Sequence, residues 1–156
     1  MRVRPATLRD YEAMCALFGE LDEFHRLARP ELFQAFGKPV RSQLQVARWL
    51  SEAGSTILVA ENEEGVVGLA VLLTRPPSPF AGAVARKVIE LDNLVVRGDQ
   101  RGKKIGRRLL AACVEWVRDR KATHLEVAVH AFNRDARRFY EGFGFQPSID
   151  QLMLTA

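Results

Sequence analysis

Apolar residues in the first third of the chain recur every three or four positions, the spacing of an amphipathic helix. One helix is predicted to follow Thr7, which suits an N-cap, and a second to begin near Pro30, which suits a first helical turn. A third helical piece is predicted to end before Gly54. The apolar positions of the three are Leu8, Tyr11, Cys15, Phe18 and Leu21, then Leu32, Phe33 and Phe36, then Leu44, Val46, Trp49 and Leu50.

From residue 57 onward the pattern changes to the dense or alternating apolar runs of β-strands. Strands are predicted over 57–60 and 66–73, and the turn sequence between them indicates an antiparallel hairpin. Residues 74–85 hold three prolines and a glycine, which predicts an exposed loop. The remaining predicted strands are a short one at Val3, a long one over 88–96, one along Leu125, Val127 and Val129, and a last one over 152–154.

Two further helices alternate with these later strands. The first carries its apolar stripe on Ile105, Leu109, Cys113, Trp116 and Val117. The second opens at Asn133, bears Ala136, Phe139 and Tyr140, and ends at the glycines of positions 142 and 144. An order of strand, helices, hairpin, long strand, helix, strand, helix and strand predicts an α/β fold with helices packed on a mixed sheet. We expect one domain over residues 1–156.

Composition supports a globular, intracellular interpretation. Hydrophobic residues make up 47% of the 156 residues, enough for a core. No apolar run approaches the roughly 20 residues of a membrane span, and the start MRVRPATLRD lacks the apolar region of a signal peptide. Cys15 and Cys113 both fall on helical patterns, as thiols of a reducing compartment do. We therefore expect a cytoplasmic protein without a membrane partner, and without a metal, because no Cys/His cluster has ligand spacing.

Positive charge is concentrated where the strand over 88–96 gives way to the next helix. The net charge of +4 is mild, yet five cations and two glycines lie in the stretch QRGKKIGRRLL from Gln100 to Leu110. The first N–H groups of a helix have no partner and carry the positive end of its dipole, so they bind anions. Gly102 and Gly106 leave the backbone open to a phosphate. The alternative is a tight turn with solvated cations; the spacing of the glycines disfavours a nucleotide triphosphatase or a dehydrogenase.

Two motifs in the second half of the chain carry a resemblance. Val95 and Val96 followed by 100–106 resemble the acetyl-CoA-binding motif of the Gcn5-related N-acetyltransferases, a strand ending in Val and then Gln/Arg-x-x-Gly-x-Gly/Ala at a helix start. Lys104 stands where that family usually has its central glycine. Residues 133–145 are similar to the family's C-terminal signature, N-x-x-A-x-x-F-Y-E-x-x-G-F. The resemblance covers residues 90–145, whereas the first 55 residues match in layout only.

The resemblance implies a mixed, mostly antiparallel sheet with helices on both faces. It also implies an N-acetyltransferase that moves the acetyl group of acetyl-CoA to a primary amine of a small molecule, peptide or protein, by direct attack in a ternary complex. Its partners are then acetyl-CoA and the amine acceptor, and family members often form homodimers. The residues expected to bind the cofactor are Leu94, Val95, Val96, Gln100, Arg101, Gly102, Lys103, Lys104, Ile105, Gly106, Arg107, Asn133, Ala136, Phe139 and Tyr140.

The same resemblance suggests the residues that carry the chemistry. Tyr140 matches the family's general acid to the departing sulfur; its alternative is a core aromatic. Glu90 and Asp92, on one face of the predicted strand with Leu94 and Val96, are candidate catalytic acids, since acids on a half-buried strand are costly unless they are used or paired. Asp92 occupies the place of an acid in several small-amine acetyltransferases, as base or as a binding group for the substrate cation.

Three alternatives accompany these assignments. A structural ion pair with an arginine would account for either acid, and an ordinary N-cap for Asn133. His25 lies where the family places its acceptor, so it is a candidate substrate-binding residue, although a lone histidine is often structural. A non-catalytic acyl-CoA sensor on the same fold is the rival function. A nucleic-acid binder is disfavoured, because the cations lack interleaved aromatic residues for base stacking.

Overall fold

Five strands and four α-helices make up the fold in the computed structural model, which describes residues 1–156. In chain order the elements are β1 (Arg2–Pro5), the 3-10 helix η1 (Leu8–Asp10), α1 (Tyr11–Ala28), α2 (Gln43–Ser51), β2 (Thr56–Asn62), β3 (Gly65–Thr74), β4 (Val88–Val96), the 3-10 helix η2 (Gly98–Gln100), α3 (Ile105–Asp119), β5 (His124–Glu126) and α4 (Arg134–Phe143). None of the helices combines the length and the apolar character that crossing a membrane requires.

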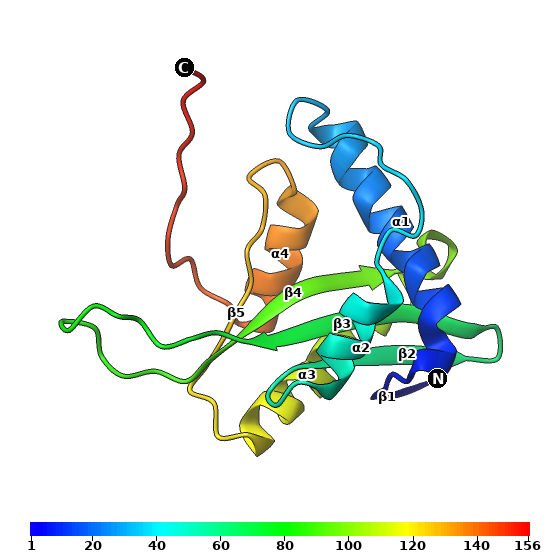
Figure 1. The fold of residues 1–156 in the computed structure, drawn as a ribbon, viewed down its shortest axis with the longest axis horizontal. Helices are drawn as coiled ribbons and strands as arrows, with labels where there is room; N and C mark the ends of the chain where they lie inside the picture. The colour runs from blue at the N-terminus through cyan, green and yellow to red at the C-terminus, as the bar shows by residue number, and fades with distance from the viewer.

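The sheet has the strand order β1-β2-β3-β4-β5, and helices cover both of its faces (Figure 1). All neighbouring strands are antiparallel except β4 and β5, which are parallel. Residues of α1 and α2, among them Phe18 and Val46, build the core on one face. Residues of α3 and α4, among them Leu109 and Tyr140, build the core on the other face. The predicted α/β architecture, its hairpin and its mostly antiparallel sheet are confirmed.

The helix predicted from Pro30 does not form. Residues 29–42 instead run through turns and loops between α1 and α2. Gly37 and Pro39 interrupt any helix here, because glycine is a poor helix former and proline lacks the N–H that the helix interior needs. The end of this loop is held against α1 by Arg41, whose guanidinium pairs with Asp22 at 2.8 Å. This loop therefore stays near α1 without being part of a helix.

Two of the predicted strands differ from the structure. Of Leu125, Val127 and Val129, only Leu125 lies in a strand, because β5 has three residues and stops at Glu126. Residues 152–154 form no strand. A strand needs a neighbour that accepts and donates its backbone hydrogen bonds, and these residues have no such neighbour within the chain.

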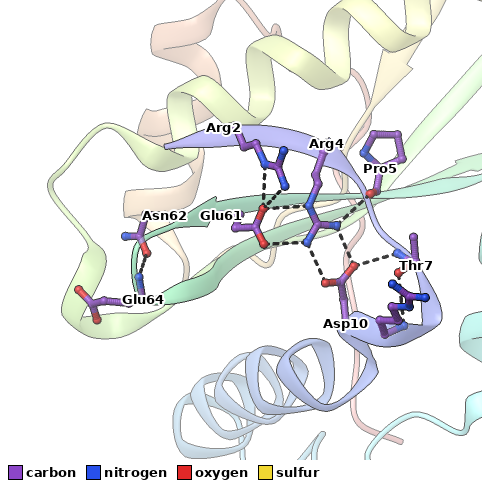
Figure 2. A network of polar contacts seen from close by, with 9 residues as sticks. Arg2, Arg4, Pro5, Thr7, Asp10, Glu61, Asn62 and Glu64 are labelled. Atoms are coloured by element: carbon purple, nitrogen blue, oxygen red, sulfur yellow. Dashed lines mark hydrogen bonds and ion pairs between the residues drawn. The ribbon is translucent and has the colours of Figure 1, made fainter.

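A network of charged side chains fixes the N-terminal strand to the start of α1 (Figure 2). Arg4 donates two hydrogen bonds of 2.9 Å to the buried carboxylate of Asp10 and further ones to Glu61 on β2. Asp10 in turn accepts from the backbone N–H of Thr7, completing a capping box and confirming Thr7 as an N-cap. Hydrogen bonds from Arg4 lower the pKa of Asp10, and those from Arg4 and Arg2 lower the pKa of Glu61 to about 2.

Replacing Asp10 by Asn should destabilise the protein at neutral pH by about 2 kcal/mol, the typical worth of hydrogen bonds to a charged group. Because the folded-state pKa values of Asp10 and Glu61 are depressed, their contribution is complete above the ordinary carboxyl range and is lost as pH falls towards about 2. Urea unfolding at several pH values would measure both effects. Asp135→Asn is the control, because its carboxylate is 90% exposed and should change stability by less than about 0.5 kcal/mol. Equal losses in the two variants would contradict a special role for the network.

Candidate active site

The parallel strands β4 and β5 stay together for only three residue pairs. Their register joins Val88–Glu90 to His124–Glu126, and beyond Glu90 the edge of β4 that faces β5 has no neighbouring strand. A cavity of about 370 Å³ opens on this side. Its wall consists of Leu21, Asp22, His25, Phe33, Gln34, Phe36, Glu90, Leu91, Asp92, Asn93, Leu94, Val127, Ala128, Val129, His130, Asn133, Ala136 and Tyr140.

A β-bulge lies in β4 at the wall of this cavity. On β3, Val71 pairs with Asn93 and Leu72 with Leu91, so Asp92 is the extra residue. Leu91 before the bulge and Leu94 after it pack against the same core cluster, which strict alternation would not allow. The expectation that Glu90, Asp92, Leu94 and Val96 share one face is therefore wrong. The bulge re-aims the strand at Asp92, as bulges beside functional sites often do.

Three carboxylates line the cavity, and two of them are neutralised by arginines. Asp22 pairs with Arg41, and Glu90 pairs with Arg75 at the start of the loop that follows β3. Asp92 has no cation within ion-pair distance; it accepts a hydrogen bond from the side chain of Asn93. Displacement of water from its carboxyl group, and then the charge of Glu90, raise the pKa of Asp92. A carboxylate with these properties is a stronger proton acceptor than an ordinary surface aspartate.

Tyr140 reaches the cavity from α4 and is 8% exposed. Its ring packs between Phe139 and Phe145. The hydroxyl makes no hydrogen bond within the protein. Every fully buried side-chain oxygen in this protein has a hydrogen-bond partner, so the Tyr140 hydroxyl is not fully buried and is open to the cavity. Burial raises the pKa of Tyr140 well above the ordinary value of 10, which keeps the phenol protonated at neutral pH. Tyr140 is thus both a core aromatic and a free hydrogen-bond donor at the site.

An aromatic cluster, here His25, His130, Phe24, Phe33 and Phe132, borders the cavity: the rings of His25, Phe33 and His130 line it, and Phe24 and Phe132 pack against these rings. The rings of His25 and His130 lie 5.2 Å apart. Nδ1 of His25 donates to the carbonyl of Leu21 at 2.9 Å, so Nε2 is the nitrogen left to contact a ligand. Burial, then the neighbouring charge of His25, lowers the pKa of His130.

His25 lines the cavity from the last turn of α1. Sequence reasoning missed His130 and Phe33, which line the cavity, and Phe132, which packs against the rings of His25 and His130. For His130 and Phe132 the sequence signal is that both aromatic rings lie in residues 130–132, directly after a predicted strand and before the N-cap Asn133. Two of these rings come from the loop after β5 and one from the loop after α1, so no local pattern joins them.

Asn133 and Ala136 both line the cavity near Tyr140. The side-chain oxygen of Asn133 accepts a hydrogen bond of 3.1 Å from the backbone N–H of Ala136, so Asn133 is an N-cap of α4. The cap gives Asn133 a structural role that uses only its side-chain oxygen, and its side-chain NH₂ has no partner within the protein. The N-cap thus does not preclude a second contact with a ligand.

The basic loop lies between η2 and α3, at the far end of β4 from β5. Lys104, the residue before α3, has a left-handed backbone with φ 63°, and Gly102 has φ 77°. A left-handed backbone favours glycine, which explains physically why the related motif has glycine where this chain has Lys104. None of the cations of the stretch from Gln100 to Leu110 pairs with a carboxylate; these are Arg101, Lys103, Lys104, Arg107 and Arg108.

Gln100 departs from the other residues of the predicted phosphate loop. Its side chain is buried, donates to Glu64 at 2.9 Å, and accepts from Asn62 and Lys103. The side chain therefore anchors the loop to the β2–β3 turn. The backbone N–H of Gln100 donates to the carbonyl of Arg97 at 2.9 Å, so neither group of this residue is a free donor for a phosphate. On the other side of the loop, the N–H of Gly98 donates to Glu20 of α1 at 3.0 Å.

The two sequence motifs meet at Gly106. A Cβ atom added there would lie 3.6 Å from the ring of Phe139 and 3.7 Å from Val96. The start of α3, the end of β4 and α4 are thus in direct contact. The structure places Glu90, Asp92, Leu94, His25, Asn133, Ala136 and Tyr140 on the cavity, and Val95, Val96, Phe139 and the loop over 100–107 outside it.

The comparison with protein families gives a direct match. The model of the acetyltransferase (GNAT) family matches residues 21–145, most of the chain. This chain belongs to the GNAT family of acetyltransferases. Its members are acyltransferases that use acetyl-CoA, and the two motifs described above are those of this family.

Two curated relatives carry N-acetyltransferase names. The uncharacterized N-acetyltransferase YhfO of Bacillus subtilis is 30% identical over 147 residues, which cover 94% of this chain and 90% of YhfO. N-acetyltransferase 8B of Rattus norvegicus is 33% identical over 100 residues, 63% of this chain. The matched part spans only 42% of the rat protein, so that likeness concerns a portion of it.

Solved structures share the fold. A tetramutant of the BH1408 protein from Bacillus halodurans superimposes with a TM-score of 0.93 at 24% identity, over the full length of both chains. The aminoglycoside N-acetyltransferase AAC(6')-Iy in complex with CoA superimposes with a TM-score of 0.73 at 14% identity, over 99% of this chain and 98% of that one. At these identities the likeness establishes the mixed α/β fold.

Replacing Lys104 by Gly should raise the free energy of unfolding by about 1 kcal/mol, because glycine adopts the left-handed backbone without strain. Chemical denaturation measures the change. Lys103→Gly is the matched control, since Lys103 has no positive φ, and there the added freedom of glycine should cost about 0.5–1 kcal/mol. If both variants lost stability equally, strain at Lys104 would be excluded.

Proposed function

We propose that the protein transfers the acetyl group of acetyl-CoA to a primary amine by direct attack in a ternary complex. One observation carries this proposal: the unpartnered hydroxyl of Tyr140 and the unpaired carboxylate of Asp92 line the same cavity. The transfer of an acetyl group from a thioester to an amine needs a proton acceptor for the amine and a donor for the sulfur. The cavity supplies one of each.

The cofactor is expected to lie along the open edge of β4, with its phosphates at the basic loop. Leu94, Val95 and Val96 belong to the part of β4 that has no neighbour on this side, so their backbone groups can pair with the amides of the pantetheine arm. The N–H groups at the start of α3 and the unpaired cations suit the pyrophosphate. The residues assigned to the phosphates are Arg101, Gly102, Lys103, Lys104, Ile105, Gly106 and Arg107, and Gln100 supports the loop from beneath through its own hydrogen bonds.

The fourth helix supports the other side of the cofactor. Phe139 packs beneath the first turn of α3, so it acts by positioning the loop. Asn133 and Ala136 face the cavity, where the free NH₂ of Asn133 can donate to the pantetheine arm. In this arrangement the thioester lies between the bulge of β4 and Tyr140.

The reaction follows from these positions. Asp92, directly or through a water molecule, accepts a proton from the ammonium of the acceptor, and the neutral nitrogen attacks the thioester carbonyl carbon. Backbone N–H groups of the open β4 edge stabilise the negative charge that develops on the carbonyl oxygen. The C–N bond forms, the C–S bond breaks, and Tyr140 donates its proton to the departing sulfur. The second proton that the nitrogen loses as it becomes an amide returns to the Tyr140 oxygen, directly or through a water molecule. The raised pKa keeps the Tyr140 phenol protonated at neutral pH, so the proton is on the oxygen when the sulfur departs.

Asp92 is a better candidate for the base than Glu90. The Glu90 carboxylate forms an ion pair with Arg75. The structural ion pair considered above as an alternative for both acids therefore holds for Glu90 and not for Asp92. Its negative charge nevertheless contributes to catalysis by raising the pKa of Asp92. Glu90 thus tunes the base from a neighbouring position.

Neither cysteine is suited to form an acyl-enzyme. Burial raises the pKa of the Cys113 thiol to about 12, so the nucleophilic thiolate is not populated at neutral pH. Cys15 contacts the carbonyl of Arg41 and does not line the cavity. Both are free thiols, which supports the cytoplasm as the compartment that we propose.

The acceptor is expected to enter through the aromatic cluster. Aromatic faces attract an ammonium group, and His25, whose Nε2 has no partner within the protein, lines the cavity beside them. The lowered pKa of His130 keeps its ring neutral at pH 7, so it does not repel a cation. Asp92 then draws the ammonium towards the thioester. We therefore assign His25 and Asp92 to acceptor binding and a primary amine as the acceptor class.

The transfer is tested by titration of the protein with acetyl-CoA and by acetylation of a panel of primary amines, with Tyr140→Phe measured alongside. We expect kcat to fall about 100-fold in this variant, the usual contribution of a proton donor, while the Kd for acetyl-CoA changes less than about threefold. Tyr11→Phe is the matched control, because the chain has two tyrosines and Tyr11 does not line the cavity. Acetyl-CoA binding without transfer to any amine would favour the acyl-CoA sensor.

Asp92→Asn separates the two roles of the carboxylate. As base, it should lower kcat at least tenfold and remove the fall in kcat that occurs as pH decreases through the pKa of Asp92. Glu90→Gln should keep that acid limb and shift it to lower pH, because the charge that raises the pKa of Asp92 is gone. A rise in KM with unchanged kcat in Asp92→Asn would restrict the residue to cation binding.

A further inference from the structure

The cavity offers an acceptor only one free negative charge. Three carboxylates line it, but Asp22 accepts hydrogen bonds of 2.8 and 3.0 Å from the guanidinium of Arg41. Glu90 is paired with Arg75 in the same way. Neither arginine lines the cavity, so each neutralises a carboxylate without offering a charge of its own to a ligand. Asp92 alone is left to hold an ammonium group.

Most of the remaining wall is apolar or aromatic. More than half of the lining residues are hydrophobic, Leu21 and Phe36 among them. The rings of His25, Phe33 and His130 lie 5.2–5.6 Å apart and are tilted against one another by 55–84°. These separations and angles are those of favourable contacts between aromatic rings. A ligand ring placed against them would gain contacts of the same kind.

A second positive charge on the acceptor would find no partner in this cavity. An ammonium group that leaves water loses free energy unless a carboxylate or another acceptor pairs with it. Cations are attracted to the faces of Trp, Tyr and Phe, and of the three lining rings of the aromatic cluster only Phe33 is one of these. One such face offsets only part of the cost of burying the charge. The cavity therefore disfavours acceptors with several amino groups.

We propose that the acceptor is a small primary amine that carries a single positive charge and an aromatic body. Its ammonium group binds at Asp92, and its ring lies against the aromatic cluster. The volume of about 370 Å³ is at the small end for ligand cavities, and the thioester takes up part of it. This assignment rests on the acetyl transfer proposed above, and it names the class of acceptor for that reaction.

Arg75 is a residue through which the charge selection can be tested. It lies in the loop after β3 with its side chain 55% exposed, whereas its partner Glu90 lines the cavity. Removing the charge of Arg75 frees a second carboxylate, two residues from Asp92 along β4. Arg86 in the same loop is the matched control, because it pairs with Glu126 at 2.8 Å and neither residue lines the cavity.

Four probe amines separate the effect of charge from that of the ring. Hexylamine and 1,5-diaminopentane have equal numbers of heavy atoms and differ by one charge, and we expect kcat/KM to be at least about tenfold higher for hexylamine. 2-Phenylethylamine and 2-cyclohexylethylamine differ in the aromatic character of the ring, and we expect about threefold in favour of the phenyl compound. Equal rates within either pair, or a preference for the diamine, overturn the proposal.

Two variants assign these preferences to residues. Arg75→Gln should lower the ratio of hexylamine to diamine by about fivefold, whereas Arg86→Gln leaves it unchanged. The charge of Arg75 also acts on Asp92, but that effect changes the rates with both amines alike and leaves their ratio. Phe33→Leu should remove the preference for the phenyl ring and keep the charge ratio. A charge ratio that is the same in Arg75→Gln and the native chain contradicts the selection by charge.

Binding without transfer distinguishes a wrong acceptor class from a wrong reaction. Each amine is titrated calorimetrically into the protein in the presence of CoA, which has no acetyl group to transfer. If 2-phenylethylamine binds more tightly than the diamine but no amine is acetylated with acetyl-CoA, the acceptor class stands and the acetyl transfer falls. If the diamine is acetylated fastest, the transfer stands and the acceptor class falls. Neither binding nor acetylation of 2-phenylethylamine also overturns the acceptor class.

Discussion

The separation of β4 from β5 beyond Glu90 is the constraint on which the site depends. A continuous sheet would consume the backbone groups of β4 on both sides and leave no place for a ligand. Three pairs with β5 are enough to position that strand, and the remainder of β4 is held by β3 alone. The cavity, the bulge at Asp92 and the approach of α4 all lie at this opening.

Of the three carboxylates at the opening, two are in ion pairs and one is not. Arginines neutralise Asp22 and Glu90, whereas Asp92 keeps its carboxylate free. At the other end of β4 the relation is reversed, and the cations of the loop are left without acids. One strand thus has an acceptor of protons near its middle and a positively charged region at its end. This polarity matches a substrate that carries phosphates at one end and a thioester at the other.

Much of this arrangement could be predicted from local sequence patterns. The bounds of β4 follow from its apolar alternation, and the position of Tyr140 follows from the motif at 133–145. The bulge could not be predicted, because a single extra residue leaves no trace in the sequence and is set by pairing with β3. The aromatic cluster could not be predicted either, because His25 and His130 are brought together only by tertiary packing. The segment over 152–154 has a strand-like pattern, but it forms no strand, because no other strand pairs with it and a local pattern does not show whether a neighbour exists.

The role of Gln100 also depends on tertiary packing, because its side chain links two turns that lie far apart in the sequence. Its amide is shared by Asn62, Glu64 and Lys103, and Glu64 also holds Arg97. The β2–β3 turn thereby anchors the basic loop that we propose as the phosphate-binding loop. Substitutions in this hairpin turn would change the position of the basic loop and hence the affinity for the cofactor. Two enzymes with identical loops therefore need not bind the cofactor equally well.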